Sequence, residues 1–99
     1  MSKKEHYCYE DYRELAFLYV IYFLSKKSSA VQMDKTNVRK KMLEIFPEET
    51  NFDSLLSISE LHGSMEQTAN SLNITDLGIE TATRLNDPIK TEIFHAISS

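Results

Sequence analysis

The stretch Leu72-Asn-Ile-Thr-Asp-Leu-Gly-Ile-Glu-Thr-Ala82 carries the strongest indication of how this chain folds. Its first residues alternate apolar and polar side chains, as a short strand does. Thr75 can end that strand and cap the helix that follows it. Gly78 and Ala82 stand about one turn apart on this helix, where small residues allow a neighbouring element to approach closely. We therefore expect a strand that leads directly into a helix.

Residues 64–74, which include the start of that stretch, permit two interpretations. Leu72 and Ile74, which follow a polar turn, indicate the second strand of a small hairpin. The spacing of Met65, Ala69 and Leu72 is equally that of a helix that continues through the segment. The sequence leaves both interpretations open.

A long apolar helix is expected before this region, from about Tyr9 to Lys27. Acidic residues lie in its first turns and lysines in its last, as the helix dipole prefers. From Leu15 to Leu24 it is apolar on every side, which is typical of a central helix or of one buried in an oligomer. Ten apolar residues span only about 15 Å as a helix, against a hydrocarbon core of roughly 30 Å, so we expect no membrane span.

Three further helices are indicated by residues that start or stop helices. These residues are Asp34 and Pro47 for the second helix, Asn51 or Asp53 and then Gly63 for the third, and Asp87-Pro88 for the last. A loop at 28–33 is expected between the first helix and the second.

The resulting order is helix, helix, helix, strand, strand, helix, helix, and in this order the chain resembles the winged-helix (winged helix-turn-helix) family. The motif that carries the resemblance is Leu72 to Ala82, about eleven residues, whereas the element order covers most of the chain. The resemblance implies a mainly α, winged-helix-like fold over residues 8–99, after a flexible N-terminus at 1–7. The alternative is an all-α bundle in which residues 64–72 are helical.

Length and composition fit one globular domain. The chain has 99 residues, of which 41% are hydrophobic and 26% charged, and only two glycines and two prolines. Its one cysteine, Cys8, cannot form an internal disulfide, and no secretion signal opens the chain. We therefore expect a cytoplasmic protein.

The charges are distributed unevenly along the chain. Residues 26–41 hold six basic side chains and one acid, whereas residues 42–83 hold eight acids and neither lysine nor arginine. Winged-helix domains usually bind DNA through the third helix and the wing, and both lie within the acidic segment. Because phosphate contacts from Lys and Arg provide most of the affinity for DNA, this surface is unsuited to it. We expect Glu60 and Glu66 to face a protein partner with a basic surface.

The basic segment is the one candidate for nucleic-acid contact. A DNA-binding, dimeric transcriptional regulator is therefore the alternative function, and its candidate contacts are Lys26, Lys27, Lys35, Arg39, Lys40 and Lys41.

No set of residues indicates catalysis, a cofactor or a metal site. His6 and Cys8 could ligate a metal, but a structural zinc site needs about four ligands. His62 lies near Ser64 in the sequence, without an evident acid to orient it. We therefore expect a small, non-catalytic regulatory protein that acts by binding.

Aromatic residues are concentrated in the first helix, and isoleucines form a stripe on the last. Each set could equally be core or interface, but a monomer of this size is not expected to bury both. We therefore predict a homodimer, or a constitutive partner-bound subunit, with the first helix and the last at the interface. The candidate protein-interface residues on them are Tyr12, Phe17, Tyr19, Tyr22, Phe23, Ile89, Ile93 and Ile97.

Overall fold

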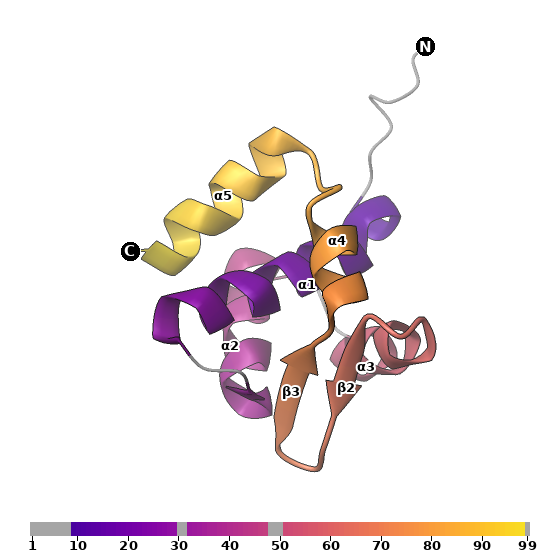
Figure 1. Cartoon of the computed structure of the whole chain (residues 1–99). Helices are drawn as coiled ribbons and strands as arrows, with labels where there is room; N and C mark the ends of the chain where they lie inside the picture. The colour runs from indigo at the N-terminus through magenta and orange to yellow at the C-terminus, as the bar shows by residue number, and fades with distance from the viewer. Residues whose placement is uncertain (1–8, 30–31, 48–50, 99) are drawn as a thin grey trace.

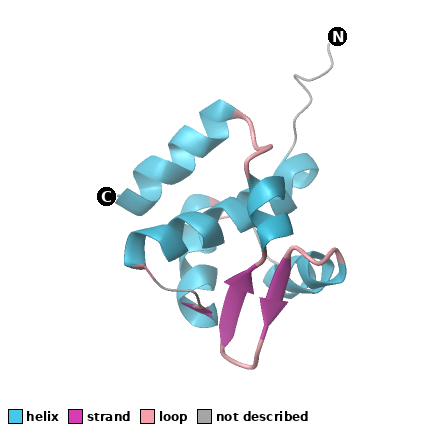
Figure 2. Cartoon of the chain, in the orientation of Figure 1, coloured by secondary structure: helices cyan, strands magenta, loops and turns pink. Residues whose placement is uncertain are grey.

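The computed structural model describes residues 9–29, 32–47 and 51–98, with side chains from residue 13 onward (Figures 1 and 2). Its helices are α1 Tyr9–Ser28, α2 Lys35–Ile45, α3 Phe52–Leu61, α4 Asp76–Ala82 and α5 Asp87–Ser98. Its strands are β1 Met33–Asp34, β2 Met65–Gln67 and β3 Ser71–Ile74. The element order confirms the expected mainly α, winged-helix-like fold.

The ambiguous residues 64–74 form a hairpin, so the interpretation as a continuing helix, and with it the all-α bundle, is wrong. β2 and β3 pair antiparallel, with Met65 opposite Ile74 and Gln67 opposite Leu72. Met65 and Leu72 are buried on the core side of the hairpin. A strand alternates its side chains between two faces, so these two apolar residues can enter the core while Glu66 stays exposed.

A third strand lies in the segment expected to be a loop. β1 pairs with β3, Met33 opposite Leu72 and Asp34 opposite Ser71, and the sheet order is β1-β3-β2. The backbone N–H of Lys35 also donates to the carbonyl of Asn70 at 2.8 Å. Two residues are too few to show the period of a strand, so this pairing depends on β3 being in place.

Local capping decides where the helices begin. The Asp34 carboxylate accepts from the backbone N–H of Asn37 at 3.1 Å and caps α2. Thr75 caps α4, because its hydroxyl accepts from the N–H of Gly78 at 3.1 Å. Both caps were expected. For α5 the capping side chain is Asn86, whose amide oxygen accepts from the N–H of Ile89 at 3.1 Å, one residue earlier than predicted.

The first helix is the enclosed centre of the fold. α1 contacts all four other helices and the sheet, and α5 lies along it (Figure 1). Its residues Phe17, Leu18, Val20 and Ile21 have no exposed surface. The premise that a monomer cannot bury both α1 and the isoleucine stripe of α5 is therefore wrong, because the two sets of side chains pack into one core.

Candidate docking surface

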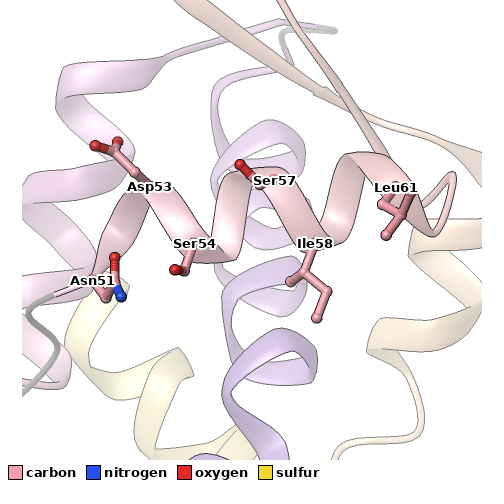
Figure 3. A pocket seen from close by; sticks show the side chains of 6 residues that line it. All are labelled: Asn51, Asp53, Ser54, Ser57, Ile58 and Leu61. Carbon is pink, nitrogen blue, oxygen red and sulfur yellow. The ribbon is translucent and has the colours of Figure 1, made fainter.

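The outer face of α3 is a stripe of side chains at helical spacing. Ser54, Ser57, Ile58 and Leu61 are all exposed and follow one another at positions i, i+3, i+4 and i+7. With Asn51 and Asp53 they line an open hollow of about 490 Å³, and Figure 3 shows their side chains along the helix. The opposite face of α3 is anchored by Phe52, Leu55 and Leu56 in the core, whose burial turns this stripe outward.

Three large aliphatic side chains are exposed on and beside this face. Leu61 is 82% exposed, Ile58 42% and Leu77, at the start of α4, 48%. Leu77 reaches the end of α3 at Gly63, where an added Cβ would stand 3.8 Å from its Cδ2 atom. Clustered rather than scattered aliphatic side chains are the kind of exposed surface that marks a binding site.

Carboxylates lie on the same elements as these aliphatic side chains. Asp53 and Glu60 lie on α3 and Glu66 on β2, and all three are exposed. The side-chain amide of Gln67 donates to Glu60 at 3.1 Å and that of Asn73 to Glu66 at 3.5 Å. Amides are neutral, so these hydrogen bonds do not neutralise Glu60 or Glu66, whereas Asp53 lines a second hollow together with Lys35 and Arg39. The expectation of an exposed Glu60 and Glu66 is confirmed; whether they meet a partner remains a prediction.

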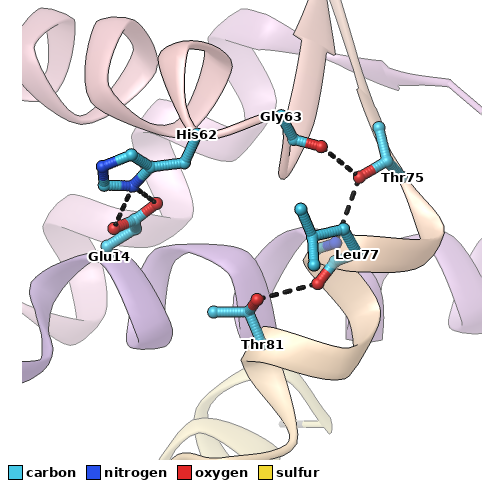
Figure 4. A network of polar contacts seen from close by, with 7 residues as sticks. Glu14, His62, Gly63, Thr75, Leu77 and Thr81 are labelled. Atoms are coloured by element: carbon cyan, nitrogen blue, oxygen red, sulfur yellow. Dashed lines mark hydrogen bonds and ion pairs between the residues drawn. The ribbon is translucent and has the colours of Figure 1, made fainter.

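A set of hydrogen bonds holds the two helices of this surface in position (Figure 4). The Thr75 hydroxyl donates to the carbonyl of Gly63 at 2.7 Å and accepts from Gly78, so one side chain joins the end of α3 to the start of α4. His62 Nδ1 lies 2.9 and 3.1 Å from the two carboxylate oxygens of Glu14, which ties the end of α3 to α1. These hydrogen bonds therefore fix the positions of the helix ends that carry Leu61 and Leu77.

The pairing of His62 with Glu14 was missed from the sequence. The two residues are separated by 48 positions, and neither belongs to a local motif. His62 was considered with Ser64, but the Ser64 side chain is buried whereas His62 is exposed. No group of three or more His, Cys, Asp or Glu side chains that could hold a metal occurs among the described residues. His6 and Cys8 lie outside them.

The basic segment does not form one continuous patch. Its side chains make separate contacts: Lys26 with the ring of Tyr22 at 5.5 Å, Lys27 with the carbonyl of Ile97 at 2.8 Å, Lys35 with the amide oxygen of Gln67 at 2.8 Å, Arg39 with the ring of Phe52 at 5.8 Å, and Lys41 with Glu44 at 3.2 Å. Lys40 is exposed. Residues that are close in sequence are thus divided between the end of α1 and the length of α2.

The predicted aromatic interface is partly assembled and partly buried. Tyr19, Tyr22 and Phe23 are half-buried on α1, with Tyr19–Phe23 and Tyr19–Tyr22 ring centroids 6.2 and 6.3 Å apart. Phe94 of α5 lies 5.3 Å from Phe23 and is 46% exposed. We call Tyr19, Tyr22, Phe23 and Phe94 the aromatic ridge. Phe94 was not among the predicted interface residues, although Ile93, which precedes it, and Phe23, whose ring it contacts, were.

Three of the predicted interface residues are instead core residues. Phe17, Ile93 and Ile97 are buried within the chain, and the assignment of these three to an interface is wrong, because α1 and α5 pack against each other. Ile89 is half-buried against the same core. The side chain of Tyr12 lies outside the described residues.

No family model, curated protein or solved structure matches the chain. Among the helices of the described part, none is long and apolar enough to cross a membrane.

Proposed function

We propose that this chain is a small, non-catalytic regulatory protein that docks on another protein through α3, the hairpin and the start of α4. The observation that carries the proposal is the set of exposed aliphatic side chains Ile58, Leu61 and Leu77, with exposed carboxylates on α3 and the hairpin. An apolar centre with a charged rim is the usual composition of a protein–protein interface. The partner accordingly presents a basic rim around an apolar centre.

The same surface argues against DNA as the ligand of α3. Glu60 and Glu66 would repel phosphates, and α3 and the hairpin contain no Lys or Arg of their own. The nearest cations are those of α2, where Lys35 and Arg39 line a hollow with Asp53. Lys35 reaches the hairpin, but its ammonium group is hydrogen bonded to Gln67. Binding to nucleic acid would have to use α2, with Lys35, Arg39 and Lys40.

The first test compares charge reversal on two faces. Glu60→Lys and Glu92→Lys change the net charge equally, but Glu60 lies on α3 and Glu92 on α5, which is at the opposite end of the molecule (Figure 1). In quantitative co-purification from the native cell, we expect a partner that Glu92→Lys retains and that Glu60→Lys binds roughly three- to tenfold more weakly, with the loss increasing at low salt.

Two results would contradict the proposal. Equal recovery of every partner by both variants would remove α3 from the binding surface. A gel shift with random duplex DNA at low salt that Arg39→Glu abolishes and Glu60→Lys strengthens would instead support the DNA-binding alternative.

A second candidate activity is self-association through the aromatic ridge. Phe94 is exposed, and it extends a row of rings across α5 and α1 that an identical copy could cover. Aromatic side chains contribute large contact areas at interfaces. This ridge replaces the interface predicted from the buried Phe17, Ile93 and Ile97.

The mass in solution tests self-association. We expect light scattering at micromolar concentration to give twice the 11.5 kDa of one chain for the wild type and a single chain for Phe94→Glu, because a buried unpaired carboxylate opposes association. Leu61→Glu is the matched control, since it adds the same charge at an exposed apolar residue of α3 and is expected to remain a dimer. A wild-type monomer would rule out this candidate.

A further inference from the structure

The α3 surface also indicates the conformation of the partner segment, an inference that rests on the proposed function. We infer that the partner presents an amphipathic helix that lies along α3, with large apolar side chains toward Ile58, Leu61 and Leu77. Lysines or arginines occupy the flank of this helix that faces the carboxylates of α3. Length, hydrogen bonding and charge each contribute to this inference.

The length of the stripe suits a helix of a few turns. Leu61 follows Ser54 by seven positions, so the stripe extends about 10 Å along the axis of α3, or two turns. The residues that line the hollow run along α3 from Asn51 to Leu61 (Figure 3). A partner helix whose apolar residues recur at i, i+3 or i+4, and i+7 would match the spacing of this stripe.

Hydrogen bonding favours a helix over an extended peptide. The backbone of α3 is committed to its own helix, so the stripe offers a partner side chains alone: two serine hydroxyls, an amide, carboxylates and aliphatic groups. An extended peptide would leave its backbone N–H and C=O groups without partners on such a surface, whereas a helix satisfies them internally. The free edge of β2 is three residues long, too short to hold an extended partner by itself.

Charge determines the composition of the flanks. Asp53 lies near one end of the stripe, and Glu60 lies near the other, with Glu66 on the adjacent strand. Because Asp53 and Glu60 are seven residues apart on α3, they lie on the same side of the stripe. A helix that carries cations along the border facing this side would place them against both carboxylates, whereas an acidic border would be repelled at both ends. The serine hydroxyls between the two ends can accept from the same cations.

The test uses four synthetic peptides of about 14 residues, a length that can form a short helix. One is an amphipathic helix of leucine, lysine and alanine. The second has the same composition, scrambled so that no apolar face forms. In the third, glutamate replaces lysine, and the fourth is the first with a central proline. Binding to the whole chain is followed by amide chemical shifts and by calorimetry.

We expect the first peptide to bind with shifts confined to α3, the hairpin and the start of α4. The scrambled and proline peptides should bind roughly tenfold or more weakly, and the acidic peptide should not bind. The substitution Leu61→Ser should lower the affinity of the chain for the first peptide by about tenfold. Phe94→Ser removes an exposed apolar side chain from the opposite end and should leave binding unchanged. Because Leu61 and Phe94 are both exposed, neither variant is expected to unfold.

Failure of this inference is distinct from failure of the proposed function. If the scrambled peptide binds as tightly as the amphipathic one, or if neither binds, the helical partner is wrong. The proposed function would still stand if a cellular partner is retained by Glu92→Lys and lost by Glu60→Lys. If the first peptide instead shifts residues of the aromatic ridge, the assignment of the site to α3 is wrong.

Discussion

Replacing Gly78 with alanine is expected to destabilise the chain by roughly 3 kcal/mol or more, because the added methyl group overlaps backbone atoms. A Cβ on Gly78 would overlap the carbonyl oxygen of Ser64 and stand 2.9 Å from its carbonyl carbon and 2.7 Å from Cγ1 of Ile74. The Ser64 carbonyl cannot easily retreat, since it accepts the hydrogen bond from the N–H of Thr75 at 3.1 Å. The higher helix propensity of alanine, about 1 kcal/mol, offsets only part of this cost.

Gly63→Ala is the matched control for this prediction. Gly63 has a φ of 76°, so alanine there is strained by roughly 1–2 kcal/mol, but the nearest atom to its Cβ would be a leucine methyl at 3.8 Å. Urea denaturation followed by circular dichroism should therefore rank wild type, Gly63→Ala and Gly78→Ala in order of falling stability. If Gly78→Ala is as stable as Gly63→Ala, the close approach of α4 to Ser64 does not exist.

Phe17→Ala is expected to cost about 3–5 kcal/mol of stability, the range for truncating a buried aromatic side chain. The Phe17 ring has no exposed surface and meets the ring of Phe52 edge-to-face, with centroids 5.6 Å apart and planes at 89°. Its loss would leave a cavity between α1 and α3 that rigid neighbours cannot close. The midpoint of thermal unfolding, measured at fixed protein concentration, gives the effect directly.

Phe94→Ala provides the comparison for Phe17→Ala. Phe94 is 46% exposed, and its truncation in a monomer is expected to change stability by less than about 1 kcal/mol. The pair of variants therefore separates a core phenylalanine from a surface one. If Phe17→Ala leaves the stability of the monomer unchanged but lowers the mass in solution, Phe17 is an interface residue after all.

The side chains that α3 exposes show why a winged-helix-like order need not imply DNA binding. The exposed face of α3 is available because Phe52, Leu55 and Leu56 anchor its other face in the core. What such a helix can bind depends on the side chains it exposes, and here they are serine, isoleucine, leucine and carboxylates. An apolar centre with acidic flanks complements a basic protein segment far better than it complements a phosphate backbone.

Local signals in the sequence determined most of the helix boundaries. Asp34, Thr75 and Gly63 act through backbone groups within a few residues of themselves, so their roles can be predicted without a fold. The acidic character of α3 and the hairpin is likewise a property of the sequence alone, because residues 42–83 hold no lysine or arginine wherever they lie.

Only the tertiary structure decided which apolar residues are core and which are surface. α1 is apolar on every side, so its sequence cannot show that Phe17 is enclosed while Phe23 borders solvent beside Phe94. That difference arises from how α5 and the sheet cover the helix. The strand β1 and the pairing of His62 with Glu14 depend in the same way on partners 37 or more residues distant. Contacts between distant residues are set by the packing of whole helices and strands, so a local sequence pattern cannot predict them.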